Sequence, residues 1–279
     1  MSTAASHTIG LIAGNGQFPL LFARAAKARG VRVYAVAMVG ETDRAIETEA
    51  DETHWVRVGQ LGRMIKLFKG ARVLKAAMAG GVRKTRLFEG VRPDLTAVKI
   101  LARCAVRRDD GMLRAIASEF EQHGIQIVDS TLYMPDCLAP AGVLTANKPS
   151  DRELTDLDYG LAIAREIGRL DIGQTVVVKD GAVVALEAIE GTDACIARAG
   201  ELTGHEGAVV IKVAKPDQDM RFDVPAIGVR TIETLKRAGV RTLGVEAGRT
   251  LLLEPERLVS AADQAGIVIV GLTSGGSDE

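Results

Sequence analysis

The stretch Ile9-Gly-Leu-Ile-Ala-Gly-Asn-Gly-Gln-Phe-Pro19 decides the fold of the first part of this chain. Residues 9–13 are predicted as a strand. Residues 19–29 are predicted as a helix with proline at its start and a glycine after its end. The glycine-rich turn between them lies at the carboxyl end of the strand, where open α/β sheets usually bind ligands. This order of strand, turn and helix predicts the first element of a Rossmann-like domain.

The turn itself is a candidate ligand site. Glycines let a ligand approach the backbone, and free N–H groups at a helix start attract phosphate. We therefore interpret four residues as ligand-binding: Gly14, Asn15, Gly16 and Gln17. A tight turn that needs glycine for steric reasons alone is the alternative. A dinucleotide site is disfavoured, because Pro19 stands where the third fingerprint glycine would be and residues 37–40 lack the acid that holds a ribose.

Strand and helix patterns continue to alternate through the first half. Strands are predicted at residues 31–38, 53–58, 73–79 and 125–128, and helices at residues 61–69, 95–105 and 112–123. Strands separated by helices favour a parallel sheet with helices on both faces. We expect an α/β fold in which residues 1–134 form a Rossmann-like N-terminal domain with a parallel sheet.

The pattern lapses at residues 135–149, which we interpret as a linker, an ordered loop inside one domain being the alternative. Residues 150–279 predict a second α/β domain. Helices are expected at 156–169, 193–202, 231–238 and 255–265, and strands at 175–179, 182–188, 208–214, 242–245 and 267–270. Asp180-Gly181 indicates a hairpin, and residues 250–253 are taken as a hairpin partner of 242–245. Hairpins among βαβ units predict a mixed sheet, with a ligand cleft between the two domains.

Composition limits the class of protein. The chain has 279 residues, 47% hydrophobic and 25% charged, which is typical of globular domains. Three separated cysteines show neither metal spacing nor a disulfide framework, and no signal peptide or membrane span is visible, so a cytoplasmic location is predicted. Residues 57–114 hold fifteen Lys and Arg against four acids. This excess favours an anionic partner, with solvated helix faces as the alternative.

Other motifs offer candidate binding residues. Gly80 and Gly81 follow a predicted strand and precede two cations, Arg83 and Lys84. Glycines and cations together could hold a pyrophosphate or phosphorylated sugar, with Gly80, Gly81 and Lys84 as the candidate binding residues; a simple turn with a basic edge is the alternative. Asp110 and Thr192 each stand beside a helix start, where they would cap the helix or face a ligand. Ser150 and Glu153 have the spacing of a capping box.

The densest polar segment, residues 212–225, is the candidate for chemistry. It places two Lys, one Arg and three Asp close together, the mixture that a phosphoryl-transfer site needs. Asp223 and Lys215 are interpreted as catalytic, and Lys212 and Gln218 as substrate-binding. A loop of charges that pair with one another is the alternative.

Five motifs in this order resemble one family: Ile12-Ala-Gly-Asn-Gly-Gln-Phe-Pro19, Gly80-Gly-Val-Arg-Lys84, Lys148-Pro-Ser-Asp-Arg-Glu-Leu-Thr155, Glu190-Gly-Thr-Asp193 and Lys215-Pro-Asp-Gln-Asp-Met-Arg-Phe-Asp-Val-Pro-Ala-Ile-Gly228. The chain is similar to the UDP-2,3-diacylglucosamine pyrophosphatases of the LpxI type. The resemblance implies an enzyme of lipid A biosynthesis with two domains. It would hydrolyse UDP-2,3-diacylglucosamine to UMP and 2,3-diacylglucosamine 1-phosphate (lipid X) with Mg²⁺ or another divalent cation. Asp223 matches the family's essential aspartate and is the implied metal ligand.

The resemblance leaves rivals open. These are another nucleotide-sugar hydrolase or transferase, and a non-catalytic protein that binds a nucleotide or lipid. No nucleic-acid partner is expected, and a homodimer is left open. The basic helix 61–69 is a candidate for peripheral contact with the inner membrane, and a buried helix with a basic outer face is the favoured alternative.

Overall fold

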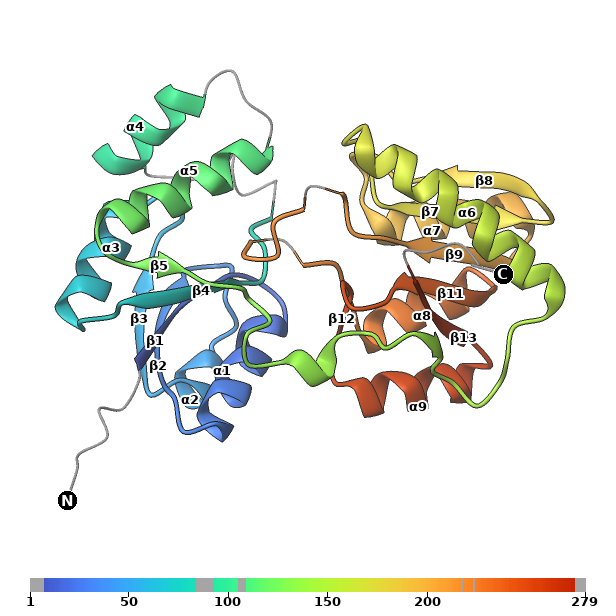
Figure 1. Cartoon of the computed structure of the whole chain (residues 1–279), viewed down its shortest axis with the longest axis horizontal. Helices are drawn as coiled ribbons and strands as arrows, with labels where there is room; N and C mark the ends of the chain where they lie inside the picture. Colours follow the sequence, from blue (N-terminus) through green and yellow to red (C-terminus); the bar gives the residue numbers. More distant parts are fainter. Residues whose placement is uncertain (1–7, 84–92, 105–108, 217, 223, 274–279) are drawn as a thin grey trace. The chain divides into compact units, whose positions relative to one another are not determined.

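The computed structural model describes residues 8–83, 93–104, 109–216, 218–222 and 224–273, and the chain divides into two compact units (Figure 1). Unit 1 comprises Met1–Pro135 and Asp219–Asp223, and unit 2 comprises Asp136–Gln218 and Val224–Glu279. The chain therefore leaves unit 2 after Gln218, passes through unit 1 again and returns at Val224.

Unit 1 is built on a parallel five-stranded sheet of order β3-β2-β1-β4-β5. Its elements are β1 (Thr8–Ala13), α1 (Phe18–Ala28), β2 (Arg32–Met38), α2 (Ile46–Glu49), β3 (Glu52–Val56), α3 (Leu61–Gly70), β4 (Lys75–Ala79), α4 (Leu95–Cys104), α5 (Asp109–Gln122) and β5 (Gln126–Ile127). The prediction of a parallel sheet is confirmed. Because the chain first extends the sheet on one side of β1 and then on the other, β1 and β4 flank a topological switch point.

Helices cover both faces of this sheet (Figure 1). The buried residues of α1 include Phe22 and Ala26. On the other face, Met64 and Phe68 of α3 pack with Phe120 of α5 in one core cluster. The apolar side of α3 is thus used inside the protein while its lysines and arginine stay exposed. The structure of α3 thus agrees with the favoured alternative, a buried helix with a basic outer face, because its apolar side chains pack in the core and are not exposed to a lipid surface.

Unit 2 is built on a mixed sheet of order β6-β13-β11-β9-β7-β8, which confirms the second predicted sheet. Its elements are β6 (Gly142–Val143), α6 (Asp151–Arg169), β7 (Thr175–Lys179), β8 (Ala182–Leu186), α7 (Thr192–Thr203), β9 (Ala208–Lys212), β10 (Ala226–Ile227), α8 (Val229–Arg237), β11 (Val240–Glu246), β12 (Leu251–Leu252), α9 (Pro255–Ala265) and β13 (Val268–Leu272). Strands β9, β11 and β13 are parallel, whereas β6, β7 and β8 pair antiparallel. Within the segment 135–149, β6 supplies the edge strand.

One predicted hairpin forms and another does not. Strands β7 and β8 pair antiparallel as expected around Asp180-Gly181. The predicted pairing of residues 242–245 with 250–253 is wrong: both edges of β11 are occupied by β9 and β13, and β12 pairs in parallel with β10 instead. A strand with two paired edges has no free backbone groups for a third partner.

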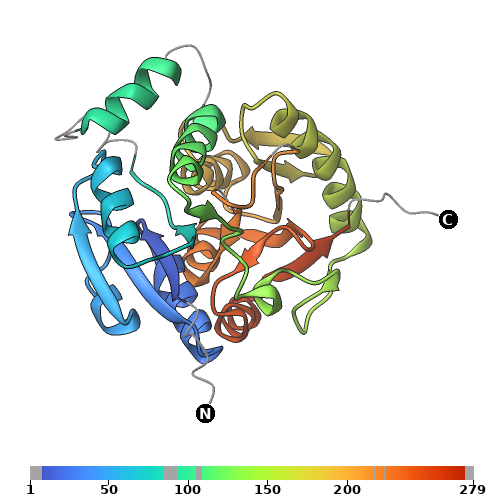
Figure 2. The ribbon, with the colours of Figure 1, turned by 60° about the vertical axis from the view of Figure 1, so that its left-hand side comes forward.

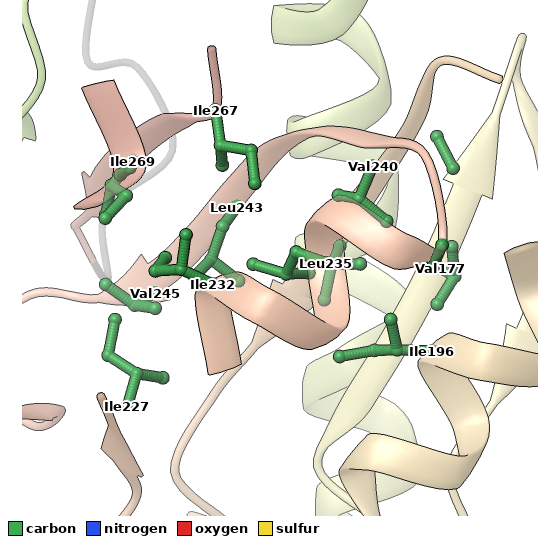
Figure 3. Close-up of a cluster of buried hydrophobic side chains, with 14 of the residues drawn as sticks. Val177, Ile196, Ile227, Ile232, Leu235, Val240, Leu243, Val245, Ile267 and Ile269 are labelled. Carbon is green, nitrogen blue, oxygen red and sulfur yellow. The ribbon is translucent and has the colours of Figure 1, made fainter. Parts of the chain in front are cut away.

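The sheet of unit 2 is covered on both faces, as Figure 2 shows for α6 and α9. Helix α6 packs Leu157 and Leu161 against Val176 and Ile211 on one face. On the other face, side chains from α7, α8 and α9 meet those of β7 and β11 in a larger cluster (Figure 3). Within the described residues, no helix is long and apolar enough to cross a membrane.

Helix α6 also holds the β7–β8 turn. Its start has the predicted capping box between Ser150 and Glu153. Asp156 lies inside the helix, where its buried carboxylate accepts the N–H groups of Asp180 (2.9 Å) and Gly181 (2.8 Å). The carboxylate thus satisfies two turn donors that the antiparallel ladder leaves unpaired.

We expect Asp156→Ala to lower the free energy of unfolding by about 1–3 kcal/mol, because two backbone donors would lose a charged acceptor. Urea unfolding followed by circular dichroism measures the change. Asp158→Ala is the matched control, since Asp158 is exposed on the same helix and should change stability by less than about 0.5 kcal/mol. Equal stabilities of the two variants would contradict the assignment.

Candidate functional site

The two glycine turns of unit 1 lie against each other at the switch point. The N–H of Gly14 donates to the carbonyl of Ala79, and the N–H of Asn15 to the carbonyl of Gly81, both at 2.8 Å. A Cβ on Gly14 would lie 2.4 Å from the carbonyl oxygen of Gly81. Gly80 has φ +77°, and a Cβ there would lie 2.2 Å from the carbonyl oxygen of Asn15. The structure therefore brings together four of the predicted binding residues, at the carboxyl ends of β1 and β4.

The open side of this pair of turns is formed by Gly16 and Gln17. Gly16 has φ +83° and nothing within 4 Å of the position its Cβ would take. Gln17 is the exposed residue before α1, and its side chain does not cap the helix. The first N–H groups of a helix have no intrahelical acceptor. An anion at this helix start would thus meet backbone donors.

Glu41, which sequence reasoning missed, and Arg83, one of the two cations predicted after the glycine pair, complete the arrangement. Glu41, after β2, accepts hydrogen bonds from the Asn15 amide (3.2 Å) and from the Arg83 backbone N–H (3.1 Å). The Arg83 guanidinium also pairs with Glu41 at 3.3 Å. The Glu41 side chain is only 1% exposed. This acid stands just beyond residues 37–40, so a search one residue further along would have found it.

The segment before Asp223 is anchored in unit 1. Ser130, which follows β5, donates its hydroxyl to the Met220 carbonyl at 2.8 Å. Arg221 pairs with Glu121 of α5 at 3.2 Å and with Asp219 at 2.8 Å. Phe222 packs on the core cluster beneath α3 and α5. Because β5 neighbours β4 in a parallel sheet, its carboxyl end lies on the same edge as the glycine turns.

Three predicted positions cannot be placed further. Asp223 and Lys84 lie outside the described residues. Asp110 belongs to α5, but its side chain lies outside the described part of the chain. Their roles stay predictions.

Unit 2 has a pocket of about 380 Å³ that brings together two other predicted residues, Thr192 and Lys212. It is lined by Glu190, Gly191, Thr192, Asp193, Lys212, Ala226 and Thr231. Lys212 is buried at the end of β9 and donates to the Ala226 carbonyl at 3.3 Å. The pocket therefore combines a cation and the first turn of α7, both suited to an anion, with the carboxylates of Glu190 and Asp193.

The Thr192 hydroxyl makes hydrogen bonds with other side chains of unit 2. Gly191, not Thr192, holds the N-cap position of α7. The Thr192 hydroxyl lies 3.1 and 3.2 Å from the carboxylate oxygens of the buried Glu187, and 3.2 Å from the hydroxyl of Thr175. A hydroxyl has one proton to donate. With that proton on Glu187, an anion in this pocket would meet the backbone N–H groups of α7.

Known proteins match most of this chain. The description "LpxI N-terminal domain" matches residues 8–137, and "LpxI C-terminal domain" matches residues 140–270. A Caulobacter vibrioides protein named UDP-2,3-diacylglucosamine pyrophosphatase LpxI is 35% identical over 275 residues, which cover 95% of this chain and 97% of that protein. The chain belongs to the LpxI family.

Two solved structures resemble this family member weakly. The biotin carboxylase domain of Hydrogenobacter thermophilus 2-oxoglutarate carboxylase has 16% identity and a TM-score of 0.26, covering 62% of this chain and 35% of that one. The biotin carboxylase subunit of pyruvate carboxylase has 18% identity and also a TM-score of 0.26, covering 61% and 34%. Neither likeness carries an argument about this LpxI chain.

Lys215 and Gln218 contact each other in the loop that follows β9. Lys215 Nζ pairs with Asp171, and its backbone N–H donates to the Gln218 side-chain oxygen at 2.7 Å. Gln218 is buried, and its side-chain nitrogen has no hydrogen-bond partner among the described residues. Within the segment 212–225, Arg221 pairs with Asp219, as the alternative interpretation expected, whereas Lys215 pairs with Asp171 outside it. A buried donor of this kind normally has a partner in a folded protein.

The described part of this LpxI chain contains no group of three His, Cys, Asp or Glu side chains that could hold a metal ion. Hydrogen bonds from Arg221 occupy both Asp219 oxygens and hold the pKa of that carboxyl below its ordinary value. Both Asp219 oxygens therefore already have a partner in the protein.

Proposed function

We propose that this chain hydrolyses the pyrophosphate of UDP-2,3-diacylglucosamine to UMP and 2,3-diacylglucosamine 1-phosphate in lipid A biosynthesis. Membership of the LpxI family supports this substrate and this bond. One observation carries the proposal: the glycine turns and the anchored segment 219–222 lie at the same edge of the sheet of unit 1, at the carboxyl ends of β1, β4 and β5.

The reaction follows from what this edge offers. Backbone N–H groups at the start of α1 would hold phosphate oxygens next to Gly16, where nothing lies within 4 Å of the position that a Cβ would take. Water would attack the sugar-side phosphorus while the bond to the bridging oxygen breaks. The water oxygen would then remain in the sugar 1-phosphate, and UMP would leave with the bridging oxygen. Asp223, next in sequence after the anchored Phe222, would orient the attacking water or hold a metal ion.

A divalent cation such as Mg²⁺ belongs to the proposal through the family resemblance, with Asp223 as its ligand. It would neutralise charge on the pyrophosphate. Lys215 and Lys212 of unit 2 are proposed to stabilise phosphate charge.

The test is release of UMP by the full-length protein from UDP-2,3-diacylglucosamine, with Mg²⁺ and with EDTA. We expect UMP and the sugar 1-phosphate in equal amounts, loss of both with EDTA, and recovery when Mg²⁺ is restored. In ¹⁸O-water the label should enter the sugar 1-phosphate. Label in UMP would refute attack at the sugar-side phosphorus, and no release of UMP under any condition would refute the hydrolase.

A further inference from the structure

We propose that Arg83 binds a phosphate group at the switch point of unit 1, and that Glu41 is the positioning residue that aims its guanidinium. The class of ligand is a pyrophosphate-bearing anion. Its identity as UDP-2,3-diacylglucosamine rests on the proposed function.

Hydrogen bonds to the protein hold the Arg83 side chain but do not use all of its N–H donors. Its Nε donates to Glu41 at 3.3 Å, and its Nη2 donates to the Gly40 carbonyl. A guanidinium carries five N–H donors. Nη1 makes no hydrogen bond to any described residue, and the side chain is 54% exposed. A rigid fork with remaining donors is the arrangement with which arginine binds phosphate oxygens.

Glu41 is placed to orient other groups rather than to meet a ligand. Its side chain is almost fully buried, and its described partners are Asn15 and Arg83. Burial tends to raise the pKa of this carboxyl. The hydrogen bonds from Arg83 and Asn15, with the guanidinium charge, outweigh burial and keep the pKa below its ordinary value. Glu41 is therefore an anion at neutral pH, and its charge is matched inside the protein.

The position of the pair links it to the ligand edge. Asn15 belongs to one glycine turn and Arg83 follows the other, and Glu41 holds both. Thr42, the next residue, donates its hydroxyl to the carbonyl of Ala13 at the end of β1. The loop after β2 thus makes hydrogen bonds to both glycine turns. An anion at the switch point would meet an arginine whose orientation is set before binding.

A purely structural ion pair is the competing explanation, and substrate kinetics separate the two. We expect Arg83→Lys to raise KM for UDP-2,3-diacylglucosamine about 10–100-fold, because lysine keeps the charge but loses the fork. Glu41→Gln should raise KM in the same direction while kcat changes less than about threefold, since the guanidinium remains but is no longer aimed. Arg83→Gln combined with Glu41→Gln avoids an unpaired buried charge if a single variant unfolds.

The matched control is Arg32→Gln. Arg32 pairs with Glu52 at 3.1 Å, an ion pair of the same type at the amino end of β2 in the same sheet. It should leave KM unchanged. Thermal unfolding of every variant records stability separately from binding.

Binding of inorganic pyrophosphate, measured by calorimetry on the full-length protein, makes the inference independent of turnover. We expect Arg83→Lys and the double variant to weaken it about 10-fold or more. Wild-type protein that binds pyrophosphate through Arg83 but cleaves no substrate would refute the proposed function and sustain this inference. Absence of pyrophosphate binding by the wild type, or folded Arg83 variants with wild-type affinity and KM, would overturn it.

Discussion

Replacing Asp223 with asparagine is expected to reduce kcat for UMP release by about 10²–10⁴-fold, the loss typical of a group that orients or deprotonates the attacking water. The substitution keeps the size of the side chain and removes its charge. The preceding residues Met220 and Arg221 are held by Ser130 and Glu121, so the backbone up to Phe222 should stay in place. A kinetic loss without loss of folding is therefore the expected result, measured as UMP formed under saturating substrate.

The control for this prediction is Asp158→Asn, an isosteric change of an exposed aspartate on α6. It should have wild-type kcat. If Asp223→Asn retained more than about a tenth of the activity, neither water activation nor metal binding by this side chain would survive as its role.

The second large effect concerns folding. Gly80→Ala should destabilise the protein by about 3 kcal/mol or more, because the new Cβ would meet a backbone oxygen and the residue would have to keep a left-handed conformation. A Cβ on Gly80 would lie 2.2 Å from the Asn15 carbonyl oxygen, and the residue has φ +77°. Backbone atoms cannot swing away as a side chain can. A fall in melting temperature of about 10 °C is the expected size for a unit of this length.

Gly81→Ala supplies the matched comparison one residue later. Its Cβ would meet only the Asn15 side-chain oxygen at 3.7 Å, an ordinary contact, and its φ is not in the left-handed range. Its melting temperature should lie within about 2 °C of the wild type, since surface changes without strain are nearly neutral. Similar melting temperatures for the two variants would disprove the steric explanation of the glycine pair.

The parallel sheet of unit 1 was predictable because its longer strands, β1 to β4, and its helices carry a hydrophobic pattern over several residues. The pairing of β10 with β12 was not, because each has two residues and their contact depends on how α8 and β11 fold between them. A pattern of two residues has no measurable period. The hairpin at 250–253 was predicted wrongly for a similar reason. Closeness in sequence suggested that residues 250–253 pair with β11, but β9 and β13 occupy both edges of β11.

The candidate site divides in a similar way. The glycine turns were predictable, since a left-handed backbone and a close approach both require glycine. The Glu41–Arg83 pair joins residues 42 apart, and Ser130 meets Met220 across 90 residues. Such contacts follow from sheet order, which no local pattern encodes. Thr192 shows the converse: its position at a helix start was read correctly, but the partner of its hydroxyl, Glu187, was visible only in three dimensions.

The return of Asp219–Asp223 to unit 1 has a consequence for how the gene can be divided. A fragment that ends at Pro135 would lack Phe222 and would leave Ser130 without its Met220 acceptor. A fragment that begins at Asp136 would carry those residues but none of the sheet that seats them. Neither half is self-contained. If the two halves were encoded separately, residues 219–222 would be made apart from Ser130 and the sheet of unit 1 that they contact. Exchange of either half alone in evolution would therefore require new contacts for this segment.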